Sequence, residues 1–226
     1  MYVKLLAPKP NAAPNVRIIV LKVYPVHIID TAAVSEMKGR KLSNIRKEYN
    51  FAAKRLTIVP LNADNALQFW EDNGVKDAND IPSYYEEFLN IIQNNPASIN
   101  GFISMLDQYP VGLFAWDEPY AGTANSVVNR RRTNTRGLSE FNVVSACKIL
   151  QEQGVKYLNR GGSEEVGLDN FKRKFRPHKT IELRSAEIMM RETKDADHRP
   201  INNNIKITTI IKPAPDAALP APSFAS

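Results

Sequence analysis

Cysteine and histidine are scarce in this sequence. Its 226 residues include one cysteine, Cys147, and three histidines, His27, His178 and His198. A single cysteine excludes an intrachain disulfide and a zinc site built from several cysteines. The histidines are scattered along the chain, which disfavours a histidine-based triad or metal cluster and predicts structural or exposed roles for them. We therefore expect no bound metal and a reducing, cytoplasmic location.

Long apolar runs and the common catalytic motifs are also missing. No run approaches the ~18 apolar residues that span a bilayer, and the N-terminus lacks the apolar centre of a signal peptide, so we expect no transmembrane segment. The sequence contains no G-x-x-x-x-G-K-[ST], H-E-x-x-H, G-x-S-x-G or G-x-G-x-x-G motif. Without these motifs, the sequence predicts a site that positions a substrate and offers no obvious covalent nucleophile.

The excess of positive charge is modest but unevenly placed. Lys and Arg number 30 against 24 Asp and Glu, which gives a net charge of +6 and a pI near 9.3. This balance suits an anionic partner such as nucleic acid, a phosphorylated cofactor or an acidic membrane surface, and a merely soluble basic protein is the alternative. Residues 34–55 combine helical spacing of apolar positions with basic side chains on the other faces. Such a helix presents either a solvated face or a surface that holds phosphates.

The chain divides into three parts. Residues 1–16 are proline-containing and aperiodic, which predicts an extended arm, and the Pro/Ala-rich residues 212–226 predict a disordered tail. Residues 17–211 form the predicted single domain, and a hydrophobic fraction of 43% is sufficient for its core. Strands are expected at 17–24, 27–29, 56–61, 99–106, 111–116, 126–130, 155–158, 180–189 and 204–211, and helices at 34–55, 65–73, 81–92, 138–153 and 168–175. These elements predict an α/β (α+β) protein with a mixed sheet and a mid-chain hairpin.

In one segment, residues 157–177, the order of the structural elements is typical of a ligand site. A buried strand ends at Asn159 and is followed by Gly161 and Gly162, an acidic pair that begins with Glu164, and a basic helix. Ligands commonly bind at the carboxyl ends of strands in α/β proteins, because the loops there vary without disturbing the sheet. An ordinary connection between a strand and a solvated helix is the alternative interpretation.

A second candidate site lies before the predicted helix 138–153. Three consecutive arginines, Arg130, Arg131 and Arg132, and the pair Arg136-Gly137 precede it. The free amides and the dipole of a helix N-terminus favour an anion, and a glycine lets the backbone approach a phosphate closely. The sequence therefore predicts an anion site at this position.

Four stretches together resemble a known family. They are RKLSNIRKEYNFAAKRLTIVPL, a following helix that ends in Trp70, GLFAWD, and YLNRGGSEEVGLDNFKRKFRP. They resemble the C-terminal catalytic region of bacterial phosphatidylglycerol lysyltransferases and their soluble relatives, which have folds of the GNAT (Gcn5-related N-acetyltransferase) type. The resemblance covers residues 39–177 and is most specific in N-x-G-G-S-E-x-x-G-L-x-x-F-K-x-K-F. It implies a GNAT-like mixed, largely antiparallel sheet flanked by helices on both faces. The family region has two such halves and this chain corresponds to the second, so a homodimer is one way to supply the other.

The resemblance also implies a reaction. An acyl or aminoacyl group would move from an activated carrier, aminoacyl-tRNA or acyl-coenzyme A, to a small-molecule or macromolecular amine or hydroxyl acceptor by direct attack. On this interpretation the catalytic carboxylates are Asp117, Glu118 and Glu164. The substrate would be bound by Trp116, Asn159, Gly161, Gly162, Ser163 and Lys172. The phosphates of the carrier would be bound by Arg130, Arg131, Arg132, Arg136, Gly137 and Lys174.

Two other functions stay open from the sequence alone. Acetyl-CoA-using GNAT enzymes usually carry a Q/R-x-x-G-x-G/A run, whereas TNTRGLSE has one glycine, which favours aminoacyl-tRNA over coenzyme A as the carrier. A non-catalytic nucleic-acid-binding protein with a GNAT-like core is the first alternative. An acyltransferase that modifies nucleic acid, with the polyanion as acceptor, is the second.

Overall fold

The computed structural model describes residues 16–72, 83–132, 135–163, 165–190 and 210–212. These residues fall into two compact units. The larger unit comprises residues 27–161 and 167–179, and the smaller comprises the described parts of 1–26, 162–166 and 180–226. The predicted arm, apart from Val16, and residues 213–226 of the predicted tail lie outside the described residues. The single domain at 17–211 stays a prediction.

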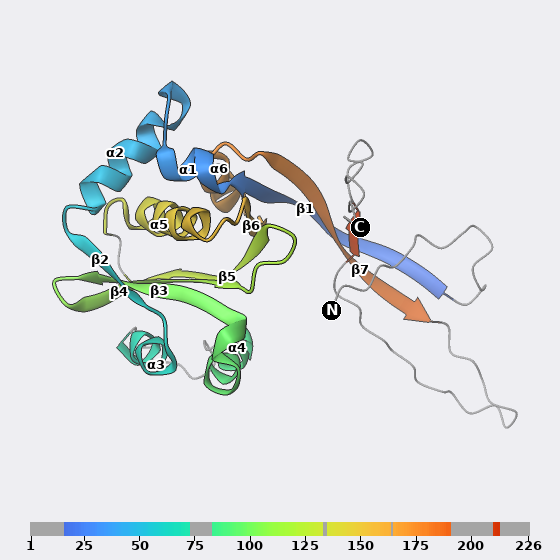
Figure 1. The fold of residues 1–226 in the computed structure, drawn as a ribbon. Helices are drawn as coiled ribbons and strands as arrows, with labels where there is room; N and C mark the ends of the chain where they lie inside the picture. The colour runs from blue at the N-terminus through green and yellow to red at the C-terminus, as the bar shows by residue number, and fades with distance from the viewer. Residues whose placement is uncertain (1–15, 73–82, 133–134, 164, 191–209, 213–226) are drawn as a thin grey trace, which may run out of the picture. The chain divides into compact units, whose positions relative to one another are not determined.

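The larger unit is built on a mixed sheet (Figure 1). Strands β2 (Leu56–Pro60), β3 (Ile99–Leu106), β4 (Tyr109–Asp117) and β5 (Thr123–Arg131) pair antiparallel in that order. Strand β6 (Tyr157–Gly162) then pairs parallel with β5. The predicted hairpin is confirmed, with Asp107 and Gln108 at positive φ in its tight turn. In the smaller unit, β7 (Lys179–Met190) pairs antiparallel with β8 (Ile210–Lys212).

Strand β4 is the centre of the core because both of its faces are covered. Leu113 and Ala115 face helices α3 (Ala63–Asp72) and α4 (Ser83–Asn94), which is followed by the short helix η3 (Pro96–Ser98). Phe114 and Trp116 face helix α5 (Leu138–Glu152) on the opposite side. Alternate side chains of a strand point to opposite faces, so a strand that is buried on both reads as a continuous apolar run. The predicted GNAT-like mixed, largely antiparallel sheet with helices on both faces is confirmed (Figure 1).

Helix α5 makes the parallel pairing of β5 and β6 possible. A parallel pair needs a long crossover connection, and α5 is that crossover. Its predicted end is confirmed, because Gly154 has φ +76° directly after the C-cap residue Gln153. Cys147 and most other residues of α5 are buried between the sheet and the neighbouring helices.

The single basic helix predicted at residues 34–55 is wrong. The structure has three pieces there: α1 (Thr31–Glu36), the 3-10 helix η1 (Arg40–Leu42) and α2 (Ser43–Ala52). Met37 and Gly39 both have positive φ, a conformation that ends a right-handed helix. The predicted cap is confirmed, since the Asp30 carboxylate accepts a hydrogen bond from the Ala33 N–H at 2.9 Å.

Two further predictions of secondary structure are corrected. The strands expected at 17–24 and 27–29 form one strand, β1 (Val16–Asp30), because Pro25 removes a donor without breaking extended backbone. In α6 (Val166–Arg173) the predicted apolar residue Leu168 is 41% exposed, whereas the predicted surface residue Lys172 is 5% exposed. The strand predicted at 204–211 lies mostly outside the described residues. None of the helices described is long and apolar enough to cross a membrane.

Candidate functional site

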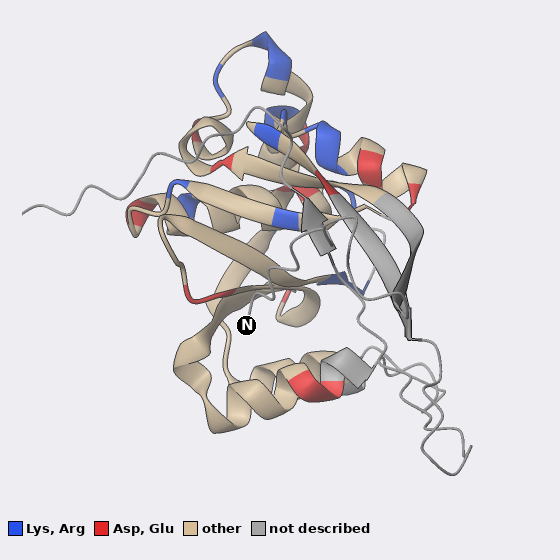
Figure 2. Cartoon of the chain, turned by 90° about the vertical axis from the view of Figure 1, so that its right-hand side faces the viewer, with Lys and Arg blue, Asp and Glu red and all other residues tan. Residues whose placement is uncertain are grey.

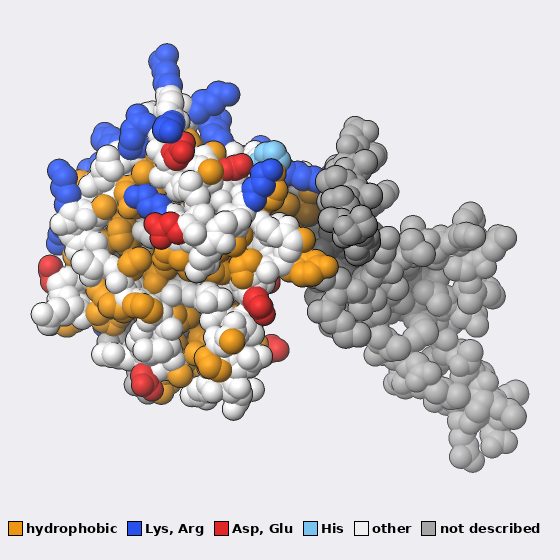
Figure 3. Space-filling view, in the orientation of Figure 1, with side chains coloured by type: hydrophobic (Ala, Val, Ile, Leu, Met, Phe, Trp, Pro, Cys, Tyr) orange, Lys and Arg blue, Asp and Glu red, His pale blue; other side chains and the backbone are white. Residues whose placement is uncertain are grey.

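Basic side chains are distributed unevenly over the larger unit. No lysine or arginine occurs in residues 56–72 or 83–129, which form β2 to β4, α3, α4 and most of β5. Lys and Arg gather instead over η1, α2 and the turn that precedes η1, away from the α3 and α4 layer (Figures 2 and 3). An anionic partner would therefore be attracted to the α2 and α5 side of the sheet.

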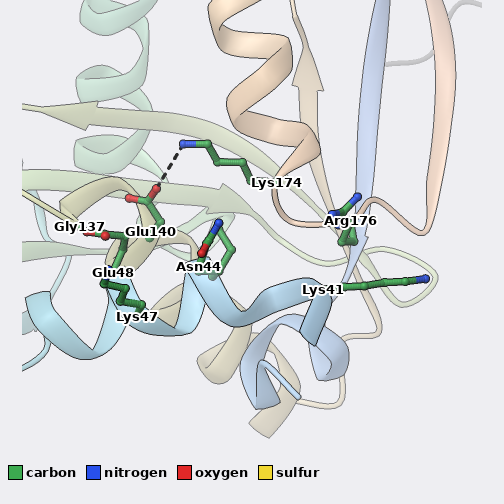
Figure 4. A pocket seen from close by; sticks show the side chains of 9 residues that line it. Lys41, Asn44, Lys47, Glu48, Gly137, Glu140, Lys174 and Arg176 are labelled. Atoms are coloured by element: carbon green, nitrogen blue, oxygen red, sulfur yellow. Dashed lines mark ion pairs between the residues drawn. The ribbon is translucent and has the colours of Figure 1, made fainter. Parts of the chain in front are cut away.

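A cavity of about 560 Å³ opens on this side, at the N-terminus of α5. We call it the α5 cavity. Helix α2, the first turn of α5 and the segment after α6 contribute its walls, and Figure 4 shows the side chains around it. Its lining includes four cations, two carboxylates and an amide: Lys41, Lys47, Lys174, Arg176, Glu48, Glu140 and Asn44. Of these, only Lys174 was among the predicted carrier-binding residues.

Both carboxylates of the α5 cavity are engaged with cations. Arg136 donates from Nε and Nη2 to the Glu48 carboxylate at 2.8 and 2.9 Å, and its guanidinium lies 4.5 Å from the centre of the Phe51 ring. The hydrogen bond from Arg136 lowers the pKa of Glu48. Lys174 extends toward Glu140, with Nζ 3.9 Å from Oε1 (Figure 4). The lysines and Arg176 therefore outweigh the acidic groups in the cavity.

Gly137 is the N-cap of α5 and also lines the α5 cavity. Its φ is +75°, and a Cβ built on it would lie 2.4 Å from the carbonyl oxygen of Glu48. The glycine is therefore needed for the close approach of α2, which differs from the predicted reason, an approach to phosphate. The first turn of α5 still points its positive dipole end at the cavity.

The three consecutive arginines are not part of the α5 cavity lining. Arg130 and Arg131 belong to β5, where their partners in the β4 ladder are Leu113 and Gly112. The backbone N–H of Arg132 donates to the Val111 carbonyl at 2.8 Å. Their side chains are exposed, so their role in binding the carrier stays a prediction.

A chain of polar contacts crosses β4, β5 and β6. Asp117 accepts from the Asn125 N–H at 2.6 Å and from Asn125 Nδ2 at 2.7 Å. Asn159 Nδ2 donates to Asn125 Oδ1 at 2.9 Å, and Asn159 Oδ1 accepts from the Gly161 N–H at 3.0 Å. The parallel pairing of β5 and β6 stops at Asn125 and Asn159, although both strands continue. These contacts therefore hold the strands at the point where their pairing ends, and both oxygens of Asp117 serve that purpose.

The remaining predicted residues are dispersed. Trp116 is 1% exposed and packs with Phe102 and Phe114, so the structure gives it a place in the core. Glu118 is exposed, and its N–H donates to the Ser98 carbonyl at 3.1 Å. Glu164 lies outside the described residues. Gly162 and Ser163 belong to the smaller unit, where the Ser163 N–H donates to the Pro25 carbonyl at 2.9 Å.

Two buried cations lie at the carboxyl end of β6. Lys172 donates from Nζ to the Gly161 carbonyl at 3.0 Å, and burial, with repulsion from Arg160, lowers its pKa to about 8. Burial likewise lowers the pKa of Arg160 to about 10. Sequence reasoning missed Arg160, although the strand alternation offered a signal: it is two residues after buried Leu158 and so shares its inward face.

His27 is buried and joined to α6. Its Nε2 lies 2.6 Å from Asp169 Oδ1, and Arg173 Nε donates to Asp169 Oδ2 at 2.6 Å. The hydrogen bond with His27, with a smaller contribution from Arg173, lowers the pKa of Asp169. This arrangement ties the end of β1 to α6. Within the described ranges, no group of His, Cys, Asp and Glu is arranged to hold a metal ion.

Comparisons with known proteins bear on the fold. No protein-family model and no curated protein matches the sequence. A conserved protein of unknown function from Bacteroides thetaiotaomicron aligns with TM-score 0.61 and 16% identity, over 80% of this chain and 64% of that one. The C-terminal DUF2156 domain of a putative lysylphosphatidylglycerol synthetase from Agrobacterium fabrum aligns with TM-score 0.56 and 20% identity, over 80% and 63%. A GCN5-related N-acetyltransferase from Kribbella flavida aligns with TM-score 0.46 and 14% identity, over 80% and 63%.

The chain thus spans about 64% of the length of the first of these structures and 63% of the second. At such identities the similarity concerns the fold, and it confirms the resemblance predicted from residues 39–177 at that level. About 80% of this chain shares the fold of the C-terminal DUF2156 domain of that putative lysylphosphatidylglycerol synthetase.

Proposed function

We propose that this protein is a GNAT-type transferase that moves an aminoacyl or acyl group from a polyanionic carrier to an amine or hydroxyl acceptor. The main support for the proposal is the α5 cavity. It brings four cations together at the N-terminus of α5, a 15-residue helix that follows β5 in the chain. Positive side chains and a helix N-terminus together suit the phosphates of such a carrier.

Aminoacyl-tRNA is the carrier that we infer. The loop before α5 has one glycine, Gly137, and that residue is packed against α2. It therefore does not leave the open glycine-rich backbone that would wrap a pyrophosphate. The basic residues of α2 continue beyond the cavity to Lys54 and Arg55, as expected for a longer polyanion.

The reaction requires one bond to form and one to break. The acceptor nitrogen or oxygen would add to the carbonyl carbon of the carrier ester, and the ester C–O bond would then break, leaving a hydroxyl on the carrier. The proton lost by the acceptor would pass to a base and then to the leaving oxygen. Backbone N–H groups of β5 beyond Asn125, where its pairing with β6 has ended, would stabilise the oxyanion. The assignment of Glu118 or Glu164 as the base stays a prediction.

Binding of three ligands tests the proposal. Purified protein is titrated with bulk aminoacylated tRNA, deacylated tRNA and acetyl-CoA, each at low and moderate salt. Preference for the charged tRNA supports an aminoacyltransferase, and binding of acetyl-CoA alone would make the protein an ordinary acyltransferase. If neither carrier binds, the proposed function is overturned.

A non-catalytic nucleic-acid-binding protein is the second candidate. It is favoured by Asp117, whose two oxygens already accept hydrogen bonds from Asn125. This candidate predicts equal, salt-dependent binding of charged and uncharged RNA and no transfer. The same titration therefore separates the two candidates.

We further propose that the protein works in the cytoplasm and forms a homodimer. Two copies would supply two transferase folds. Light scattering at micromolar concentration measures the mass, and a strictly monomeric mass contradicts the dimer.

A further inference from the structure

Arg160 is a buried cation that has no anionic partner among the residues that the structure describes. The residue is 5% exposed, and its Nη1 is buried without a hydrogen-bond acceptor. Its guanidinium lies 5.3 Å from the centre of the Phe171 ring and 4.8 Å from that of Phe175. Contacts with aromatic faces stabilise a cation partly, but they do not satisfy N–H donors. A buried charge without a paired group costs several kcal/mol, so this arrangement calls for an explanation.

The acidic groups near Arg160 are committed elsewhere or uncharged. Asp169 is held by His27 and Arg173. Glu140 lies close enough to act on the charge of Arg160, but its carboxylate pairs with Lys174 Nζ at 3.9 Å. Cys147 also lies close enough to influence Arg160, but burial raises its pKa to about 12 and keeps the thiol neutral. In the described part of the chain, no carboxylate lies within ion-pair distance of Arg160.

The position of Arg160 suits a ligand. It follows Asn159, the last residue of β6 that pairs with β5, and so begins the segment where the two strands are no longer joined. Lys172 brings a second cation, an ammonium group, to the same strand end, where it donates to the Gly161 carbonyl. Two cations of different geometry, a planar guanidinium and a point charge, thus lie beside the end of a parallel strand.

We propose that Arg160, assisted by Lys172, binds an oxyanion of the acceptor substrate, either a carboxylate or a phosphate. The assignment of this oxyanion to the acceptor rests on the proposed transferase function. The oxyanion site itself does not depend on that function. The α5 cavity holds the carrier, and the end of β6 holds the anionic group of the molecule that receives the acyl group. The acceptor is therefore an amine or alcohol that also carries a negative charge.

Thermal unfolding of the full chain tests the site without any carrier or turnover. Chloride is replaced by inorganic phosphate or by acetate at constant ionic strength, and the unfolding midpoint is followed. The wild-type midpoint should rise saturably with at least one of the two anions. Because the α5 cavity can also bind phosphate, only a phosphate response that depends on Arg160 indicates a phosphate-bearing acceptor. A rise with acetate alone indicates a carboxylate-bearing one. No rise with either anion overturns the proposal.

Arg160→Met and Lys156→Met are compared with the wild type. Replacing a buried, unpaired charge by an apolar side chain should leave the fold intact and raise the anion-free midpoint, while the part of the anion response that depends on Arg160 is lost. Lys156 is exposed and is not part of the α5 cavity lining, so Lys156→Met should respond as the wild type does. A full anion response in Arg160→Met overturns the proposal.

Two further measurements separate the alternatives. Arg160→Met should keep the wild-type affinity for the carrier. If this variant loses affinity for the carrier together with its anion response, the bound anion belongs to the carrier instead of the acceptor. The second needs no variant: the pKa of Lys172, about 8 in the free protein, is followed by NMR of its ε carbon. Bound phosphate or acetate should raise it, and an unchanged pKa at anion concentrations that shift the midpoint would remove Lys172 from the site.

Discussion

Arg136 and Glu48 join the loop before α5 to helix α2 through two parallel hydrogen bonds of 2.8 and 2.9 Å. Glu48 lines the α5 cavity, and Arg136, which is not part of its lining, neutralises this acidic residue among the lysines. Arg136 was expected to bind the carrier directly. In the structure Arg136 holds α2 against α5 and limits the negative charge that a phosphate would meet, and its direct contact with the carrier stays a prediction.

Glu48→Gln should therefore strengthen binding of polyanions. The substitution removes a negative charge from the α5 cavity and frees the guanidinium of Arg136 for a phosphate. We expect the affinity for tRNA to rise several-fold and the salt slope to steepen by up to about one. Fluorescence anisotropy with labelled tRNA measures both, and Glu152→Gln, at the other end of α5, is the control. Weaker binding in Glu48→Gln would show that the ion pair itself shapes the binding surface.

Gly137→Ala should destabilise the protein more than Gly154→Ala. Both glycines have positive φ, but a Cβ at Gly154 meets open space, whereas one at Gly137 meets the Glu48 carbonyl at 2.4 Å. Backbone strain alone costs about 1–2 kcal/mol. We expect Gly137→Ala to lose ~3 kcal/mol or more, because α2 must also move. Urea unfolding of both variants measures the difference, and equal losses would exclude the steric contribution.

Asp117→Asn should reduce stability. An asparagine would turn one donor toward Asn125, whose N–H and Nδ2 both need acceptors. The expected loss is about 1–3 kcal/mol, measured by urea unfolding. Glu118→Gln, at an exposed neighbouring position, should change stability by less than about 0.5 kcal/mol. Unchanged stability of Asp117→Asn together with lost turnover would assign Asp117 to catalysis as the sequence predicted.

Lys172 should make stability depend on pH in the alkaline range. Burial lowers its pKa from 10.5 to about 8, so the folded state disfavours the charged form. Below pH 8 Lys172 is protonated in both the folded and the unfolded state, and the folded protein bears the full free-energy cost of burying the ammonium group. This cost disappears as the pH rises to 10.5. Relative to Lys172→Met, the wild type should therefore gain stability between these values. The raised pKa of the Cys147 thiol acts in the opposite direction but is present in both proteins and cancels.

Urea unfolding of wild type and Lys172→Met at three pH values measures this difference. A difference that is independent of pH would indicate an ordinary pKa and a solvated ammonium group.

The periodicity of apolar residues predicted the helices and strands that are buried on one face or on both faces. The continuous apolar run of β4 and the regular spacing in α5 correspond to a strand and a helix that are buried on both sides, and the glycine after α5 marks its end. The break at Met37 escaped prediction because apolar residues at 37, 42 and 45 are buried in the broken segment as they would be in a continuous helix. Left-handed backbone at a methionine has no sequence signature of its own.

The site was harder to predict because its residues come together only in the tertiary structure. Lys41 and Lys47 were visible as a basic helix, but their approach to Gly137 and Lys174 depends on how α2 packs on α5. Charge alone placed Lys172 on the surface, whereas the structure buries it against the Gly161 carbonyl. The α5 cavity lies at the helix end where the sequence predicted an anion site, and of the residues predicted to bind the carrier, Gly137 and Lys174 line it. Binding of an anion there stays a prediction.

The central claim is that the α5 cavity binds the phosphates of a carrier, and the salt dependence of tRNA binding tests it most directly. Lys41→Met and Lys174→Met are compared with Lys156→Met, which removes the same charge from the opposite end of α5. Each of the first two should lower the affinity for tRNA and reduce the salt slope by about one, while Lys156→Met should change neither. Equal behaviour of all three variants would contradict phosphate binding at the α5 cavity.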